Sequence, residues 1–451
     1  MRSQLNEKIN LPNEQKTKQS QRSVLIIGGG IAGIVASLEL ANLNFKVYLI
    51  ERNPTIGGHV AQLAEVYPTL ENAIETIEPL MKELWKHSNL ELLTYAEVKE
   101  IRRGVNDFRV KITRKPRFVE EIKCNGCGEC AKICPVEVPS DFDLGLSKRK
   151  AIYLSYSQAV PSVYTIDKDH CLYFQNGTCK SCAEVCPNAA INYDQKEQEE
   201  TAEVEGIIIC TGYDLFDAKK IREYGYGVFK NVLLSLQLER LCSANGPTKG
   251  KVIRPSDGKE PESVAFILCV GSRAETALKH CCHVGCMAAV TQAYTLKKSF
   301  EDKIKIYICY SDLRSYGKQH EELYQKVRNL GINFIRGIPA EIHELSDGSL
   351  MFDVFDMATN QLIRINAGLV VLEVGLRSSE DSEALGKIAG VPIGPDSFFL
   401  EAHPKLRSTE TAIPGIFIAG SAQGPKDVTE TVAHAKAAVM SAVAFLNQRC
   451  K

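Results

Sequence analysis

Short apolar runs alternate with amphipathic stretches along the first part of the chain. SVLIIG (23–28) is a β-rich apolar run, a glycine turn follows it, and IAGIVASLELANLN (31–44) has helical periodicity. A second apolar run, FKVYLIE (45–51), comes next, and residues 71–89 and 91–115 have the patterns of an amphipathic helix and of strands. This β-α-β alternation predicts a parallel sheet.

The alternation stops between about residues 119 and 195, where Cys, Pro and loop residues dominate. Order resumes at VEGIIICTGYD (204–214), which is typical of a buried strand. SVAFILCVGS (263–272) then opens a second β-α-β unit. Its expected helix lies near 283–300 and its next strand at 303–310, with a buried strand at 368–376 and a strand-turn-helix at 412–445.

Composition narrows the classes of function. The 451 residues are 44% hydrophobic, which allows two or three packed domains, and the net charge of −1 argues against nucleic acid as a partner. No run approaches ~18 apolar residues, so we expect no membrane span. Residues 1–22 have no apolar core and are predicted to be a disordered tail rather than a signal peptide, which favours a cytoplasmic protein. In a reducing cytoplasm, the sixteen cysteines of the chain indicate metal or redox chemistry rather than disulfides.

The first glycine turn has the spacing of a dinucleotide site. Gly28, Gly30 and Gly33 follow a strand and open a helix in the order G-x-G-x-x-G. They allow a tight turn, close approach of a pyrophosphate to the backbone, and close packing of helix on strand. Glu51 ends the second strand, where a carboxylate can accept hydrogen bonds from a ribose hydroxyl.

The chain also resembles the two-dinucleotide flavoproteins, and this resemblance favours FAD over NAD. It is carried by RNPTIGGH after Glu51, by ICTGYD (209–214) and by PGIFIAGSAQ (414–423), although Ser421 stands where an acidic residue usually binds ribitol. A helix starting near Asp427–Thr429 would point its N-terminus at the isoalloxazine and stabilise negative charge there. The further flavin-binding residues that this implies are Arg52, Gly57, Gly58, Thr211, Gly212, Gly420, Ser421, Lys426 and Val428.

The cysteine-rich stretch has the spacing of a two-cluster ferredoxin. Its first run, C-x2-C-x2-C-x3-C-P, comprises Cys124, Cys127, Cys130 and Cys134, and its second comprises Cys171, Cys179, Cys182 and Cys186 with a longer first gap. In two-cluster ferredoxins the fourth cysteine of each run binds the other cluster. We therefore expect one [4Fe–4S] cluster on Cys124, Cys127, Cys130 and Cys186, and one on Cys171, Cys179, Cys182 and Cys134. Paired zinc knuckles are the alternative.

The second β-α-β unit lacks a complete nucleotide turn. CVGSRAET (269–276) keeps only Gly271, so NAD(P)H binding is not expected there. Cys269, Cys281, Cys282 and Cys286 stand nearby, beside His280 and His283, and could bind a third cluster. The alternative is a group of small buried thiols. Cys210, Cys242, Cys309 and Cys450 are isolated, and we expect ordinary core or surface roles for them.

With these motifs, the sequence from residue 23 to 451 resembles the A subunit of heterodisulfide reductase, an iron–sulfur flavoprotein. The resemblance runs through CNGCGECAKICPVEVPSDFDLGLSKRKAIYLSYSQAVP, HCLYFQNGTC, RPSDGK (254–259), CVGSR and GPKDVTETVAHAKAA. Flavin subunits of the quinone-interacting membrane-bound oxidoreductase and of the heterodisulfide-reductase-like complex of sulfur oxidisers are also similar. The family's H-C-S-R-V-C-C-M reads HCCHVGCM (280–287) here, so Cys269, Cys281 and Cys286 carry over, and the fourth ligand is Cys282 or a histidine.

The resemblance implies an α/β fold with two Rossmann domains of the thioredoxin reductase-like, two-dinucleotide-binding kind and an inserted α+β ferredoxin-like module. Longer methanogenic members carry a further cluster domain at each end, so the resemblance does not by itself imply electron bifurcation. The expected domains are a tail (1–22), an FAD-binding domain in three parts (23–118, 199–260 and 367–451), the [4Fe–4S] insert (119–198) and the second Rossmann-like domain (261–366).

The leading hypothesis is an oxidoreductase subunit that passes electrons between FAD and [4Fe–4S] clusters to partners in thiol, disulfide or sulfur metabolism. No side chain is expected to act as a catalytic nucleophile or base, because the cofactors carry the chemistry. The implied partners are B- and C-like subunits and a ferredoxin or a hydrogenase or dehydrogenase module, with a homodimer as the oligomeric state. A stand-alone NAD(P)H-dependent FAD oxidoreductase and a zinc-stabilised scaffold are the alternatives.

Overall fold

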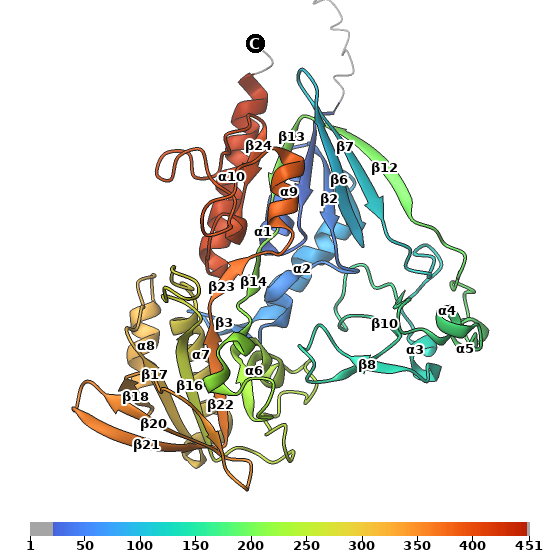
Figure 1. The fold of residues 1–451 in the computed structure, drawn as a ribbon. Helices are drawn as coiled ribbons and strands as arrows, with labels where there is room; N and C mark the ends of the chain where they lie inside the picture. Colours follow the sequence, from blue (N-terminus) through green and yellow to red (C-terminus); the bar gives the residue numbers. More distant parts are fainter. Residues whose placement is uncertain (1–20, 449–451) are drawn as a thin grey trace, which may run out of the picture.

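Two five-stranded parallel sheets form the framework of the protein (Figure 1), whose computed structural model describes residues 21–448. Residues 1–20 of the expected tail, and Cys450, lie outside the described residues. Arg22, expected to belong to the tail, is instead fixed to the body of the protein. Its guanidinium lies 3.3 Å from the Glu205 carboxylate and donates to the Leu446 carbonyl at 2.7 Å.

The first sheet has the strand order β24-β13-β1-β2-β5. Its strands are β1 (Ser23–Ile27), β2 (Lys46–Glu51), β5 (Leu90–Thr94), β13 (Gly206–Ile209) and β24 (Ile416–Ile418), and the helices α1 (Ile31–Asn42), α2 (Ala73–Lys86) and α10 (Val428–Gln448) belong to the same domain. Side chains alternate across β1, so that Val24 and Ile26 pack with the helices. Leu25 and Ile27 pack on the opposite face.

That opposite face is covered by an antiparallel three-stranded sheet, from which the cysteine-rich module departs. Its order is β12-β7-β6, with β6 (Ala96–Arg103), β7 (Phe108–Arg114) and β12 (Gln198–Val204). The module leaves after β7 and returns at β12, and these strands pair from Arg114↔Gln198 onward. Both ends of the module are therefore tied to the first domain by one ladder of hydrogen bonds.

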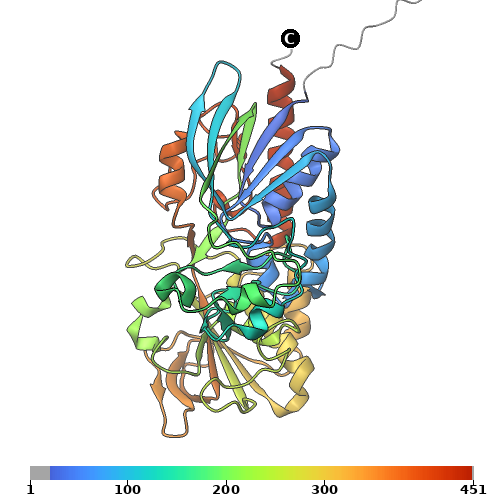
Figure 2. The same ribbon diagram turned by 90° about the vertical axis from the view of Figure 1, so that its right-hand side faces the viewer.

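The cysteine module extends from the side of the first domain, and lies toward the viewer when the molecule is turned (Figures 1 and 2). It holds little regular structure: α3 (Glu129–Ile133), β8 (Glu137–Pro139), β9 (Lys148–Lys150), β10 (Ile152–Tyr153), β11 (Thr165–Ile166), α4 (Leu172–Asn176) and α5 (Ser181–Glu184). Its own core is small and includes the buried Cys130 and Cys182 beside Phe118 and Ile152. A small apolar core of this kind is typical of modules that bound metals stabilise.

The second sheet has the order β15-β22-β16-β17-β18. Its elements are β15 (Val232–Leu234), α6 (Ser235–Cys242), β16 (Ser263–Val270), α7 (Gly285–Phe300), β17 (Lys305–Tyr310), α8 (His320–Arg328), β18 (Asn333–Arg336) and β22 (Leu369–Val374). A second antiparallel sheet packs on it, formed by β19 (His343–Glu344), β20 (Leu350–Asp356) and β21 (Gln361–Ala367).

The division of the chain between the two domains differs from the expected one. β15 and β22 pair with each other and lie in the second sheet, although the expected boundaries assigned 199–260 and 367–451 to the FAD-binding domain. Short apolar strands look alike in sequence, and only their long-range register decides which sheet they join. The domains are instead linked by the antiparallel pair β14 (Tyr213–Leu215) and β23 (Leu376–Ser378).

The remaining elements are short and lie in both domains. They are β3 (Glu65–Val66), β4 (Glu71–Asn72), α9 (Ser382–Ala389) and short 3-10 turns at Gly58–Gln62, Ala218–Lys220, Arg222–Tyr224, Glu301–Lys303 and Gly420–Ala422. Within residues 21–448, no helix has the length and apolar content needed to cross a bilayer.

Candidate functional site

A cavity of about 980 Å³ lies where the two domains and the cysteine module meet. The turn after β1 lines it with Gly28 and Gly30, the module with Phe142 and Tyr156, and α7 of the second domain with Thr291. It therefore opens at the carboxyl ends of the first parallel sheet, the usual place for a ligand in such a fold.

The turn after β1 leaves room for a ligand at one glycine and none at another. A Cβ at Gly30 would meet nothing nearer than the Gly58 Cα at 4.0 Å, whereas a Cβ at Gly33 would lie 1.8 Å from the Gly28 carbonyl oxygen. Gly30 thus borders open space, and Gly33 lets α1 pack on the strand. Gly30 caps α1 without a side-chain bond, so the first amide groups of the helix are left for an anion.

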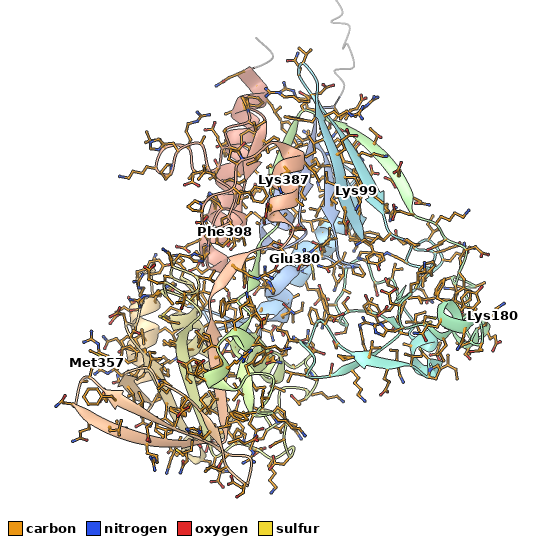
Figure 3. The ribbon with its side chains drawn as sticks, viewed as in Figure 1. Lys99, Lys180, Met357, Glu380, Lys387 and Phe398 are labelled. Atoms are coloured by element: carbon orange, nitrogen blue, oxygen red, sulfur yellow. The ribbon has the colours of Figure 1, made fainter. Side chains whose placement is uncertain are left out.

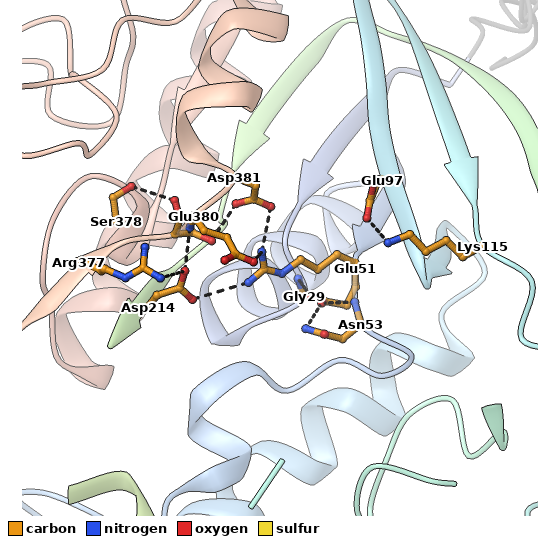
Figure 4. Close-up of polar contacts among 12 residues, drawn as sticks. Gly29, Glu51, Asn53, Glu97, Lys115, Asp214, Arg377, Ser378, Glu380 and Asp381 are labelled. Atoms are coloured by element: carbon orange, nitrogen blue, oxygen red, sulfur yellow. Dashed lines mark hydrogen bonds and ion pairs between the residues drawn. The ribbon is translucent and has the colours of Figure 1, made fainter. Parts of the chain in front are cut away.

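Glu51 is buried beside this turn. Its Oε2 accepts the Gly29 backbone N–H at 2.7 Å, and its Oε1 accepts the backbone and side-chain amides of Asn53 at 2.8 Å each (Figure 4). Burial raises the pKa of this carboxyl, although the hydrogen bonds oppose the rise. The carboxylate is held rigidly at the cavity wall.

Arg52 connects the first domain to the segment that returns from the second. Its guanidinium lies 3.2 Å from Asp381, 3.8 Å from Asp214 and 3.9 Å from Glu380. These three carboxylates lie close to one another in Figure 4. Arg52 and its three acidic partners all line the cavity.

The structure brings most of the expected flavin-binding residues to the cavity wall. Those that line it are Gly28, Gly30, Glu51, Arg52, Gly58, Thr211, Gly212, Ser421, Lys426 and Val428. Three do not line it: Gly33, Gly57 and Gly420 are buried behind the wall. Gly57 donates its N–H to the Gly29 carbonyl at 2.8 Å, and a Cβ on Gly420 would lie 2.9 Å from Ala32, so both permit close packing.

One orphaned group indicates that the wall is built for a polar ligand. Thr211 Oγ1 is buried and has no hydrogen-bond partner among residues 21–448. A buried hydroxyl without a partner costs about 1–3 kcal/mol, which a bound ligand recovers. The adjacent Gly212 has φ +74° and no neighbour within 4 Å of an added Cβ.

Lys426 and the start of α10 form another part of the wall. Lys426 Nζ donates to the Gln423 side chain and to the Gly424 carbonyl, and burial lowers its pKa to about 8. Asp427 Oδ1 accepts the Glu430 N–H at 2.8 Å, and Glu430 accepts the Asp427 N–H at 3.1 Å. This reciprocal cap fixes the helix end that was expected near the isoalloxazine.

Two acidic residues at the cavity end nearest the second domain were not expected from the sequence. Glu239 accepts the Ala64 N–H at 2.8 Å and the Gln292 amide at 2.7 Å, and burial raises its pKa to about 7. Glu373 is also buried, its pKa is raised by burial to about 8, and its Oε1 lacks a partner among the described residues. The signal was present, since Glu373 is the single charge in the apolar strand LVVLEV.

The eight cysteines of the module form two groups. Cys124, Cys127, Cys130 and Cys186 surround one small cavity, and Cys134, Cys171, Cys179 and Cys182 surround another. The last cysteine of each run has therefore crossed to the group of the other run, as the sequence predicted. Burial raises the pKa of Cys130 to about 12. Binding of a metal would remove the proton of such a thiol.

Four more cysteines gather at the carboxyl end of β16. Cys269 stands in a left-handed conformation (φ +62°), and Cys281 and Cys282 precede α7, whose first turn carries Cys286. A hydrogen bond from the Cys282 thiol lowers the pKa of Cys281 well below its ordinary value. Burial raises the pKa of Cys286 to about 11, and the charges of Cys269 and Cys281 add to the rise.

The neighbouring histidines are engaged elsewhere. His280 Nε2 lies 2.8 Å from the Leu376 carbonyl, and His283 Nε2 lies 2.9 Å from the Glu430 carboxylate. Cys282 is therefore better placed than either histidine to complete this group of four.

Comparisons with known proteins agree with this geometry. Residues 26–77 match the NAD(P)-binding Rossmann-like domain, and residues 118–140 match the 4Fe-4S binding domain. The chain is 48% identical over 427 residues to the iron-sulfur A subunit of the CoB--CoM heterodisulfide reductase of Methanocaldococcus jannaschii, covering 94% of this chain and 64% of that protein. The chain is related to the A subunit of heterodisulfide reductase.

Other relatives extend this result. The A subunit of the H(2)/formate:CoB-CoM heterodisulfide,ferredoxin reductase of Methanococcus maripaludis is 47% identical, with 96% of this chain and 65% of that protein covered. The chain thus spans less than two thirds of the length of these relatives. Thioredoxin reductase from Lactococcus lactis has the same fold, with a TM-score of 0.51 at 17% identity over 95% of this chain and 100% of that one.

These findings confirm the resemblance to the A subunit of heterodisulfide reductase and the thioredoxin reductase-like fold class, while the assignment as an oxidoreductase subunit stays a prediction. The match to the 4Fe-4S binding domain agrees with the expected [4Fe–4S] clusters, while FAD, the number of clusters and the individual ligands stay predictions.

Proposed function

We propose that this chain transfers electrons between FAD and [4Fe–4S] clusters and passes them to partner subunits of a heterodisulfide-reductase-like complex. One observation carries the proposal. The cysteine module forms two interlocked groups of four thiols, and the same module provides part of the wall of the dinucleotide cavity. FAD supplies two-electron chemistry, and [4Fe–4S] clusters accept electrons one at a time.

The FAD pyrophosphate would be held at the turn formed by Gly28 and Gly30, with the ribose at Glu51. Thr211, Gly212 and Ser421 would contact the rest of the dinucleotide, because they line the same cavity. Lys426 and the first amides of α10, at Val428, would stabilise negative charge on the flavin ring. The buried carboxyl groups of Glu239 and Glu373 can hold protons at the opposite end of the cavity.

Two clusters would be bound in the module, one by Cys124, Cys127, Cys130 and Cys186 and one by Cys134, Cys171, Cys179 and Cys182. A third would be bound by Cys269, Cys281, Cys282 and Cys286, which lie together near the N-terminus of α7. All twelve of these cysteines are free thiols, so none is withheld from a cluster by a disulfide.

The terminal reaction would be the reduction or formation of a disulfide, or related sulfur chemistry, on a partner. The names of the relatives mention hydrogen, formate and ferredoxin, and we propose a ferredoxin or a hydrogenase or dehydrogenase module as electron donor or acceptor. B- and C-like subunits would complete the complex, with this chain as a homodimer. We propose no role for nucleic acid, since the net charge is −1.

The stand-alone NAD(P)H oxidoreductase receives no support from the second glycine turn. A Cβ on Gly271 would lie 2.2 Å from the Phe216 ring, which packs against this turn. The space where a Rossmann turn admits a pyrophosphate is therefore occupied by an aromatic side chain.

The test is cofactor analysis of the chain purified without oxygen. We expect about one FAD and about eight to twelve irons, at four per cluster. Cys171→Ala and Cys130→Ala should each lower the iron content by about four, whereas Cys309→Ala, a buried cysteine outside all three groups, should leave it unchanged. Iron near zero, zinc in its place, or rapid flavin bleaching by NADH or NADPH without a partner would refute the proposal.

A further inference from the structure

The two groups of four cysteines in the module differ in their side-chain hydrogen bonds at sulfur. One group has a short bond with Tyr193 and a long contact of 3.8 Å between Cys179 Sγ and Ser181 Oγ, and the other has none among the described residues. The Tyr193 hydroxyl lies 3.1 Å from Cys182 Sγ, and Cys182 belongs to the group with Cys134, Cys171 and Cys179. Tyr193 and Cys182 are eleven residues apart in sequence, so the contact depends on the fold of the module rather than on local geometry.

The Tyr193 ring is held in place on several sides. It stacks on Tyr173 with ring centroids 3.8 Å apart, and Phe174 contacts it edge-on at 5.9 Å. The preceding residue, Asn192, donates its backbone N–H to the Phe118 carbonyl at 3.0 Å. With the ring wedged and the backbone bonded, the hydroxyl has little freedom to turn away from the sulfur.

The other group contains a tyrosine without such a bond. Tyr164 lines the cavity of Cys124, Cys127, Cys130 and Cys186, and its hydroxyl lies 3.0 Å from where a Cβ on Gly128 would stand. No hydrogen bond from Tyr164 to a cysteine sulfur is present within residues 21–448. Backbone amides point at sulfurs in both groups, as at Cys186, which accepts the Ala190 N–H at 3.3 Å, and at Cys171. The phenol is therefore the shorter of two hydroxyl contacts at sulfur in one group, since the Ser181 hydroxyl lies 3.8 Å from Cys179 Sγ.

We propose that Tyr193 raises the reduction potential of the cluster bound by Cys134, Cys171, Cys179 and Cys182, so that an electron entering the module settles there. A hydrogen bond to a ligand sulfur draws electron density from the thiolate, and this stabilises the cluster that carries one more negative charge. The proposal rests on the proposed function, because it requires that both groups bind [4Fe–4S] clusters.

The places of the two cysteine groups in the module indicate where the proposed difference in reduction potential would draw an electron. The group of Cys124 is tied to the first domain through Gly126, which packs on Ser162, and through Val160, whose N–H donates to Thr55 Oγ1 at 2.9 Å. α4 and α5, which belong to the other group, lie at the outer edge of the module in Figure 1. Lys180, placed 5.6 Å from the Tyr173 ring, marks the same edge in Figure 3. Tyr193 thus favours the cluster at the outer edge of the module.

The experiment compares Tyr193→Phe with Tyr164→Phe in the full chain, prepared without oxygen and titrated with dithionite while cluster signals are followed by electron paramagnetic resonance. Tyr193→Phe keeps the stacked ring and removes the hydroxyl. We expect one wave, the higher-potential wave of the module, to move to lower potential in Tyr193→Phe, and no wave to move in Tyr164→Phe. A shift of the lower wave, an equal shift in both variants, or no shift would overturn the inference.

Resonance Raman spectra of the oxidised protein give a second readout. The Fe–S stretching bands should shift less on transfer to D₂O in Tyr193→Phe than in the parent and in Tyr164→Phe, since one exchangeable O–H···S bond is missing. Equal isotope shifts in all three proteins would contradict the inference. Iron absent from the parent protein would instead refute the proposed function, so the two failures are distinguishable.

Discussion

At the scale of single residues, the cavity wall contains glycines that leave room for a ligand and charged side chains that are held in place by hydrogen bonds. Gly30 faces open space, and Glu51 and Lys426 are fixed by hydrogen bonds at either side of it. The glycines and Glu51 could be predicted because each follows a strand at a fixed spacing. Glu239 could not, because its role depends on the contact of α6 with Ala64 and Gln292, which are distant in sequence.

The first prediction concerns the space at Gly30. Gly30→Val should reduce FAD affinity at least about tenfold (about 1.4 kcal/mol), because the added side chain occupies the path of the pyrophosphate while the apoprotein has room for its Cβ. Flavin content by visible absorbance and affinity by fluorescence titration provide the measurement. Gly206→Ala, in β13 and away from the cavity, is the control. Full retention of FAD in Gly30→Val would contradict the site.

The second prediction concerns Glu373. Its pKa in the folded protein, raised by burial to about 8, exceeds that of an unfolded glutamate, so the folded state holds the proton more tightly. The free energy of unfolding should then fall as pH rises from about 5 to about 8, with a slope of up to about 1.4 kcal/mol for each pH step of one, and Glu373→Gln should remove this fall.

This is measured as the difference in Tm between pH 5 and pH 8. Glu373→Gln should narrow that difference relative to the parent, and Glu262→Gln, an exposed control, should not. The same pH dependence in all three proteins would show that Glu373 does not hold the proton.

At the scale of elements, the main feature is the way in which the cysteine module attaches to the rest of the protein. Its position between two strands could be predicted from the break in the apolar pattern, and the grouping of its cysteines from the spacing of two C-x2-C-x3-C-P runs. That these groups bind clusters stays a prediction. The docking of the module could not be predicted, since it depends on single polar contacts. Arg240 of α6, almost fully buried, donates to Asp143 of the module at 2.9 Å, and Gln237 donates to the Leu144 carbonyl at 3.0 Å.

The third prediction tests this docking. Asp143→Ala should destabilise the protein by about 1–3 kcal/mol, because it leaves one donor of the buried Arg240 unpaired. Hydrogen exchange of β8 and β9 should become faster. The control is Asp141→Ala, which removes an exposed ion-pair partner of Arg149. This change should lower the free energy of unfolding by less than about 1 kcal/mol. Equal effects of the two variants on exchange would contradict a role of Arg240 in holding the module.

At the scale of the whole molecule, the two Rossmann units differ in the residues that surround their glycine turns. The first keeps its glycine turn and a dinucleotide cavity, and the second has Phe216 packed against Gly271 and four cysteines beside it. Two β-α-β units with parallel sheets could be predicted from apolar periodicity and turns, and the thioredoxin reductase-like fold class from the resemblance to known flavoproteins. The place of β15 and β22 in the second sheet could not be predicted, because the pairing partners of short strands are set by contacts far apart in the chain.

The fourth prediction follows electrons from the flavin to the clusters. The chain, prepared without oxygen, is reduced stepwise by light and a photosensitiser while flavin absorbance and cluster paramagnetic resonance are recorded together. Electron transfer within the chain predicts that cluster signals grow as the flavin bleaches, and that Cys130→Ala and Cys171→Ala each remove part of them. Complete flavin bleaching without any cluster signal, in protein that contains iron, would contradict electron transfer between these cofactors.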